Sequence, residues 1–232
     1  MKMRYGVVIA ALLLCLSCLP AHAGQEMYVL GGMCLANLGG DAELFGQQLA
    51  DGLGADIGGV WIPQKKMRTG FDFGVGLGYE APSSVVGGAI EAHYVTRGTK
   101  WNFTEVSVTG IQVKTTLKLD YVEIPFLAQV SPQTGSRVRP VFLLGPVLGI
   151  RASSSLKAEG PGGTISTDIG DGMKSTYFGG LVGAGMKVQT TAKSSFLVQA
   201  RYQLGLSNVI DDPDISFKPQ DFSVLLGYSF GI

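Results

Sequence analysis

The sequence is poor in charged residues, histidine and cysteine. Only 16% of its 232 residues are charged, and 18 basic residues balance 18 acidic ones. Because no basic run stands out, nothing predicts a nucleic-acid partner. Cys34 is the only cysteine after residue 23, so residues 24–232 cannot form an internal disulfide. His93 is the only histidine in that region, which excludes a site built on several histidines.

Long hydrophobic runs and cofactor motifs are also lacking after residue 23. No uncharged apolar run there reaches the 18 residues or more that a transmembrane helix needs. Glycine-rich segments such as 74–78 and 179–185 lie inside predicted strands, with no helix after them to form a phosphate-binding loop. We therefore expect no catalytic residues, no cofactor-binding residues, no metal and no enzymatic activity.

The N-terminal segment is typical of a secretory signal peptide. Lys2 and Arg4 precede an apolar stretch, and Ala21 and Ala23 are the small residues that a signal peptidase recognises. We expect residues 1–23 to be a signal peptide cleaved near Ala23, and residues 24–232 to form one domain. The segment contains two basic and no acidic residues, so cleavage would leave a slightly acidic chain.

Residues 117–150 have the pattern of a β-hairpin. Two segments rich in β-branched and aromatic residues flank a turn of Ser, Pro and Gly. In each segment every second residue is apolar, as in Val122–Val130 and Phe142–Ile150, whereas the alternate positions carry Glu123 and Arg151. Each strand is therefore predicted to have one wholly apolar face and one mixed face.

Similar alternation extends along the chain and predicts eight strands. Their expected ranges are 27–37, 70–81, 85–97, 117–130, 139–150, 176–189, 196–207 and 221–232. Long connections (38–69, 98–116, 152–175, 208–220) alternate with short ones (82–84, 131–138, 190–195). An even number of strands with alternating short and long connections is typical of outer-membrane barrels, in which the short turns are periplasmic. The sequence therefore predicts an all-β fold, an eight-stranded antiparallel up-and-down transmembrane β-barrel.

The charged residues of the predicted strands share a face with many of the 34 glycines. The interior of an eight-stranded barrel is just wide enough for side chains, so glycines there would leave room for long Glu and Arg side chains. Buried charges must be paired, and we expect a polar network in the lumen that serves either as a structural plug or as a gate or relay. Its candidate members are Glu91, His93, Glu123, Arg151, Lys187 and Arg201. Pro125 and Pro146 fall within paired strands, where bulges or local unpairing are expected.

Several segments resemble a known family. They are NLGGDAE at 37–43, YVEIPFL at 121–127, PVFLLGPVLG at 140–149 and QARYQLGLSNV at 199–209. In this order they are similar to segments of the PorT-like outer-membrane β-barrel family of Bacteroidota. Members of this family are OmpA/OmpX-like eight-stranded barrels. The resemblance implies an outer-membrane location and contact with outer-membrane lipid. It also implies, less directly, an accessory role in secretion, because the namesake of the family takes part in the export of cargo proteins.

Alternation continues through residues 101–119, which predicts that two strands extend beyond the bilayer as a hairpin. The inward face of this hairpin would need cover. One possibility is the preceding long connection, where Leu44, Phe45 and Leu49 have the spacing of a short amphipathic helix. The other is a protein partner at the extracellular loops, held by a surface comprising Trp101, Phe103, Ile111 and Val113.

The expected function is accordingly a structural or protein-interaction role in the bacterial outer membrane. A small transport conduit and an outer-membrane enzyme are the alternatives.

Overall fold

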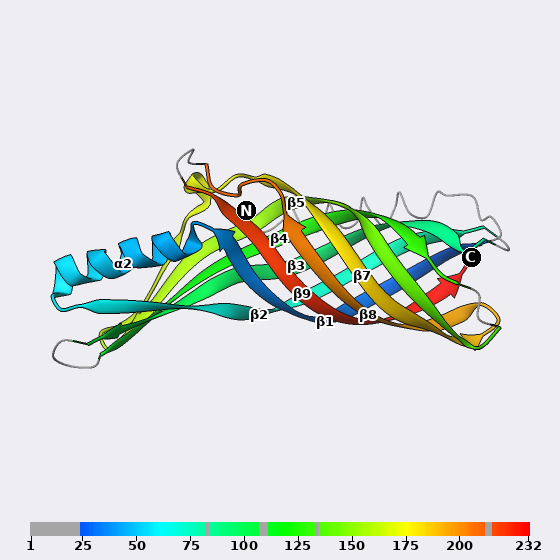
Figure 1. Cartoon of the computed structure of the whole chain (residues 1–232), viewed down its shortest axis with the longest axis horizontal. Helices are drawn as coiled ribbons and strands as arrows, with labels where there is room; N and C mark the ends of the chain where they lie inside the picture. Colours follow the sequence, from blue (N-terminus) through cyan, green and yellow to red (C-terminus); the bar gives the residue numbers. More distant parts are fainter. Residues whose placement is uncertain (1–23, 82–83, 107–110, 133–134, 212–214) are drawn as a thin grey trace.

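A computed structural model of the chain describes residues 24–81, 84–106, 111–132, 135–211 and 215–232 (Figure 1). The expected signal peptide, residues 1–23, lies outside the described residues. The strands are β1 (Gln25–Gly40), β2 (Trp61–Glu80), β3 (Val86–Glu105), β4 (Gln112–Val130), β5 (Val138–Gly160), β6 (Gly163–Asp168), β7 (Thr176–Thr191), β8 (Ser194–Gly205) and β9 (Phe217–Gly231). Helix α2 (Ala42–Ile57) follows β1, and a 3-10 turn η1 (Gly170–Gly172) precedes β7.

Eight of the strands form a closed antiparallel barrel. Each pairs with its neighbours in the order β1, β2, β3, β4, β5, β7, β8 and β9, and β9 pairs again with β1 from Glu26↔Gly231 to Gly40↔Phe217. Closure satisfies the backbone of the first and last strands, which would otherwise be open edges. The eight-stranded up-and-down barrel that the sequence predicts is therefore confirmed. Strand β6 is a ninth strand outside the ring, in the connection expected at residues 152–175, and it pairs only with the end of β5.

The two faces of the strands lie as the alternation predicts. In β4, Tyr121, Glu123 and Leu127 are buried, whereas Phe126 and Val130 point outward and are exposed. The outward side chains are large and apolar around the whole ring; Phe71, for example, is 68% exposed. An apolar exterior around a polar interior is the arrangement of a barrel in lipid.

The barrel has two unlike ends (Figure 1). At one end, which we call the short-turn end, brief turns join the strands and the C-terminus emerges. At the other, the long-connection end, β2, β3, β4 and β5 continue well past the barrel as a sheet to which β6 is added, and α2 lies along this sheet. Sequence alternation underestimated the extension, since β2 begins at Trp61 and β5 continues to Gly160. Among the residues that the structure describes, no helix is both long and apolar enough to cross a membrane.

The prolines interrupt the pairing locally. Two gaps in the described ladders lie close to Pro125. In the first, Phe126 and Leu127 of β4 are not paired with β5; in the second, Glu91 and Ala92 of β3 are not paired with β4. The register is the same on both sides of these gaps, so they are unpaired steps rather than bulges. Proline lacks the N–H that a ladder needs, which accounts for the gaps.

Glycines on the inner face make room for aromatic rings. A Cβ atom added at Gly76 would lie 2.4 Å from the ring of Tyr28, and one at Gly149 would lie 1.9 Å from the ring of Tyr177. No real Cβ could be accommodated at such distances without movement of the ring. The sequence predicts that lumen glycines leave room for long Glu and Arg side chains; at these two positions the space is occupied by tyrosine rings instead.

Candidate functional site

Buried charges fill the lumen, and the first group of them is centred on Glu91. This carboxylate of β3 accepts hydrogen bonds from the Arg201 guanidinium of β8 at 2.6 and 2.9 Å, and from the Tyr28 hydroxyl of β1 at 2.6 Å. The ring of His93 lies between Glu91 (Nε2 to Oε2, 2.9 Å) and Asp72 of β2 (Nδ1 to Oδ1, 2.6 Å). All five residues are buried. This set, the Glu91 cluster, joins β1, β2 and β3 to β8.

A second group, the Arg97 cluster, lies nearer the long-connection end. The Arg97 guanidinium pairs with Glu123 at 2.8 Å and Asp221 at 2.7 Å, and it donates to the Tyr177 hydroxyl at 2.8 Å. Tyr177 also donates to Glu123. The amide of Gln203 donates to Tyr177 at 2.7 Å and to Glu123 at 3.1 Å. Five different strands therefore contribute one side chain each.

Both clusters depend on complementary charges because water cannot reach them. A buried carboxylate or guanidinium without a partner destabilises a protein strongly, whereas a pair with further hydrogen bonds is tolerated. In the Glu91 cluster, Glu91 is compensated by Arg201, and His93 is held by two carboxylates. The arrangement ties opposite walls of the barrel together and leaves these groups in fixed positions.

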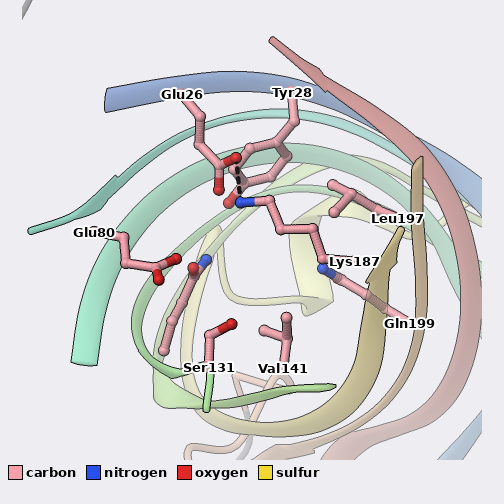
Figure 2. Close-up of a pocket in the computed structure, with 9 residues that line it drawn as sticks. Glu26, Tyr28, Glu80, Ser131, Val141, Lys187, Leu197 and Gln199 are labelled. Carbon is pink, nitrogen blue, oxygen red and sulfur yellow. Dashed lines mark hydrogen bonds and ion pairs between the residues drawn. The ribbon is translucent and has the colours of Figure 1, made fainter. Parts of the chain in front are cut away.

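Two of the six candidate lumen residues lie apart from these clusters. Lys187 reaches across the short-turn end to Glu26, with Nζ and Oε2 2.5 Å apart (Figure 2). Arg151 lies at the long-connection end, where it donates to the Gly170 carbonyl at 2.7 Å and the Ser154 hydroxyl at 3.2 Å. The expectation of one network with all six residues is therefore wrong, because the length of the barrel separates its two ends. Glu91, His93 and Arg201 meet in the Glu91 cluster, whereas Glu123 lies in the Arg97 cluster.

The sequence-based selection missed several network members. Arg97 and Asp72 could have been recognised from the sequence, because side chains alternate along a strand and both positions fall on the inward face of their strands. Tyr28, Tyr177 and Gln203 gave a weaker signal, because tyrosine and glutamine occur on either face of a strand. Pairing across the lumen leaves no periodic trace in the sequence.

Two cavities lie toward the short-turn end of the barrel. A cavity of about 10 Å³ lies between Glu26, Tyr28, Lys187 and Gln199, which is room for about one water molecule (Figure 2). A wider vestibule of about 540 Å³ opens at the short-turn end, with Glu80, Arg139 and Lys187 in its wall. The Glu91 cluster lies in the barrel beyond it.

The polar side chains of the lumen that the structure describes are mostly engaged with one another. Within the described part of the chain, no three residues of the metal-binding types are placed to hold an ion. His93 uses both ring nitrogens on Asp72 and Glu91, and it is 3% exposed. Cys34 is fully buried, with its thiol against the Thr96 carbonyl at 3.3 Å.

The inner face of the extended sheet is covered by α2 rather than left open. Trp101 and Phe103 are 1% and 0% exposed. The indole N–H of Trp101 donates to the Ala42 carbonyl at 3.2 Å, and Phe45 packs on the Trp101 ring with 5.8 Å between centroids. Leu49 packs against the same cluster. Of the two sequence-based possibilities, the covering helix is the one in the structure.

The predicted interaction surface is accordingly wrong in part. It comprised Trp101, Phe103, Ile111 and Val113. Trp101 contacts the protein's own helix and Phe103 is buried in the same hydrophobic cluster, so neither can meet a partner while α2 is in place. Val113 is half-buried and packs against the same core, because β4 continues its inward face to the end of the hairpin. Ile111 is 38% exposed and remains accessible.

A closed barrel with a lipid-facing apolar exterior and a charged interior defines a transmembrane β-barrel protein. A sequence model of the family "Outer membrane protein beta-barrel domain" matches residues 56–211, about two thirds of the chain. The chain belongs to this family, and it is a protein of the bacterial outer membrane. The long-connection end is then extracellular and the short-turn end periplasmic.

Comparison with solved structures gives similar folds at low identity. The attachment invasion locus protein Ail of Yersinia pestis is 17% identical, with a TM-score of 0.40, and the match covers 88% of this chain and 98% of that one. Neisserial surface protein A (NspA) is 14% identical, with a TM-score of 0.43 and coverage of 89% and 97%. OprG of Pseudomonas aeruginosa is 12% identical, with a TM-score of 0.40 and coverage of 91% and 99%. No curated protein matches the sequence.

Proposed function

We propose that this outer-membrane protein is a plugged, non-enzymatic barrel that presents an extracellular sheet to a protein partner. The plugged lumen supports this most directly. The Glu91 and Arg97 clusters fill the barrel with mutually bonded side chains, so the regions free to bind other molecules lie outside the bilayer. The sheet of β2 to β6 is one of these regions.

An exposed apolar patch at the tip of this sheet is the proposed contact surface. Val60, Ile62, Val106 and Ile111 are between 38% and 61% exposed. Val106 and Val60 are hydrogen-bonded neighbours at 3.0 Å, and Glu105 bonds to Ile111 at 2.9 Å, so the four residues lie together at the end of β2, β3 and β4. Apolar residues gathered this far from the lipid-facing band favour an interaction site. This tip patch replaces the surface centred on Trp101.

The resemblance of the chain to PorT-like barrels suggests the kind of partner. The YVEIPFL segment that carries the resemblance forms the middle of β4, where Glu123 belongs to the Arg97 cluster. By this resemblance, we propose an accessory role in secretion or in the assembly of surface proteins.

Site-specific photo-crosslinking in intact cells tests the proposal. With a benzoylphenylalanine probe at Val106, we expect a discrete adduct of one size that contains a second protein. The same probe at Val224, which faces lipid on β9 and is 47% exposed, is the matched control. Failure to form an adduct at Val106, or the same adduct from both positions, would contradict a partner at the tip patch.

A small conduit is the second candidate, and the vestibule of about 540 Å³ favours it. To conduct, the barrel would have to part Glu91 from Arg201 and Arg97 from Glu123 and Asp221 at the same time. Separating buried charges leaves each uncompensated, so this opening is costly. Partner binding by a plugged barrel is therefore better supported than conduction.

A further inference from the structure

The outer face of the extracellular sheet carries a row of lysines. Strand register places them together: Lys66 of β2 is directly opposite Lys100 of β3, Lys100 is opposite Thr116, and Thr116 is opposite Lys157 of β5. Directly opposite residues in antiparallel strands point to the same face. The lysine row, as we define it, comprises Lys66, Lys100, Lys114, Lys118 and Lys157.

The flanking residues fix the direction of these side chains. Lys100 lies between Thr99 and Trp101, and Lys118 lies between Leu117 and Leu119; all four neighbours are buried on the inner face. Because a strand alternates, the lysines must point away from α2. Lys66, Lys100 and Lys114 are exposed in the structure.

The positive charge of the row is only partly compensated. The carboxylates on the same face are Asp120, Glu159 and Asp168, and of these only Glu159 makes an ion pair with the row, with Lys157. The hydrogen bond and charge of Lys157 lower the pKa of the Glu159 carboxyl, and the charges of Lys114 and Lys100 lower it further. In the described ion pairs, no carboxylate is matched to Lys66 or Lys100, although like charges directly opposite one another destabilise a sheet. An external anion would relieve this repulsion.

The row begins close to the lipid-facing band of the barrel. Lys118 precedes Val122 by four residues on the same face of β4, which is about 14 Å along the strand and less in height because strands tilt. Tyr94, an exposed aromatic residue of the same outer face, lies six residues before Lys100 in β3. A lysine can also lower its charged head toward the membrane surface along its flexible stem. The lysine row is thus within reach of lipid headgroups.

From this placement we propose that the lysine row binds the phosphate groups of an anionic glycolipid in the outer leaflet. Three features favour lipid over a soluble polyanion. The row is continuous with the lipid-facing face, it is on the side of the sheet opposite the helix, and its lysines follow the strands across the sheet from Lys118, the member nearest the lipid-facing band. Basic residues near a membrane surface are attracted to anionic headgroups, and the attraction decreases with salt.

Binding of lipopolysaccharide to the detergent-solubilised protein tests the assignment, with the bound fraction measured by native mass spectrometry. The triple variant Lys66→Gln/Lys100→Gln/Lys114→Gln should bind about tenfold more weakly or worse, since each lost charge weakens attraction to anionic headgroups. The variant Lys66→Arg/Lys100→Arg/Lys114→Arg should bind as the natural sequence does. The charge-matched control Lys174→Gln/Lys193→Gln/Lys218→Gln removes three exposed lysines from other parts of the surface and should have little effect. Heat-modifiable migration on a gel establishes that each variant is a folded barrel.

Chemical removal of phosphate from the lipopolysaccharide should reduce binding by the natural sequence to the level of the Gln variant. Equal binding of the Gln variant and the natural sequence, or equal binding of phosphorylated and dephosphorylated lipid, would overturn the proposal. Displacement of the glycolipid by millimolar inorganic phosphate would assign the row to free phosphate instead. Tighter binding of heparin than of the glycolipid would assign it to a soluble polysaccharide, and both results count against a lipid ligand.

Discussion

At the scale of single residues, the lumen is organised by contacts between glycines and large polar side chains. Tyr177 shows this most clearly, because its hydroxyl joins Arg97, Glu123 and Gln203 while its ring lies over Gly149. Its ring also packs edge-on against Tyr121, with 4.9 Å between centroids. The position of one ring therefore determines the geometry of the whole Arg97 cluster.

Replacement of Gly149 by alanine should destabilise the barrel by about 1–3 kcal/mol, the usual effect of overpacking. The new Cβ would meet the Tyr177 ring at 1.9 Å and push its hydroxyl away from Glu123. Urea unfolding in lipid vesicles measures the loss. Gly180→Ala is the matched control, because a Cβ there has no atom within 4 Å. If both variants had the same stability, the ring would not be held as the structure shows.

At the scale of elements, α2 covers the inner face of the extended sheet. Its residues Phe45 and Leu49 pack on the hydrophobic cluster that includes Trp61, Trp101 and Phe217. Phe45 lies edge-on to Phe217 of β9 at 5.4 Å, so the helix also contacts the barrel strand that pairs with β1. The helix thus replaces water over a face that would otherwise be apolar and exposed.

The variant Phe45→Ala should loosen this helix at a cost of up to about 3 kcal/mol, somewhat below that of a fully buried phenylalanine. The chain has two tryptophans, and both lie beneath α2, at 5% and 1% exposure. Quenching of tryptophan fluorescence by acrylamide therefore reports directly on the helix and should increase. Leu44→Ala is the control, since Leu44 is 64% exposed and should leave quenching unchanged. Unchanged quenching in Phe45→Ala would contradict a covering role for the helix.

At the scale of the whole molecule, ion pairs across the lumen complement the hydrogen-bonded ring. The ladders hold each strand to its neighbours, whereas Glu91 and Arg201 connect β3 with β8, which are not paired strands. Arg97 and Asp221 connect β3 with β9 in the same way. The barrel is thus held both around its circumference and across its diameter.

Planar-bilayer recordings should accordingly show negligible current for the natural sequence. The double variant Glu91→Ala/Arg201→Ala removes one pair across the lumen and should give brief, measurable openings. Lys157→Ala/Glu159→Ala removes an ion pair of the extracellular sheet and should stay silent. A steady current from the natural sequence would favour the conduit over the plugged barrel.

The sequence by itself determined the strands of the barrel and their faces. The alternation of side chains along a strand is a local property. The outward direction of Phe126 and the inward direction of Glu123 can therefore be predicted from the order of residues. The short amphipathic helix was also visible in the spacing of Phe45 and Leu49. Strand ends were less visible, because the polar extracellular part of β5 has no apolar face for alternation to reveal; Ser153, Ser154 and Ser155 belong to a strand that looked like a loop.

Only the tertiary structure decided which inward residues meet. Closure of the ring brings Glu91 to Arg201, 110 residues apart, and keeps Lys187 and Arg151 at opposite ends. It likewise places α2 over Trp101, which removes that residue from any partner, and aligns lysines of β2, β3, β4 and β5 on one outer face. These relations depend on register and on the circumference of the barrel, which arise from pairing between distant strands.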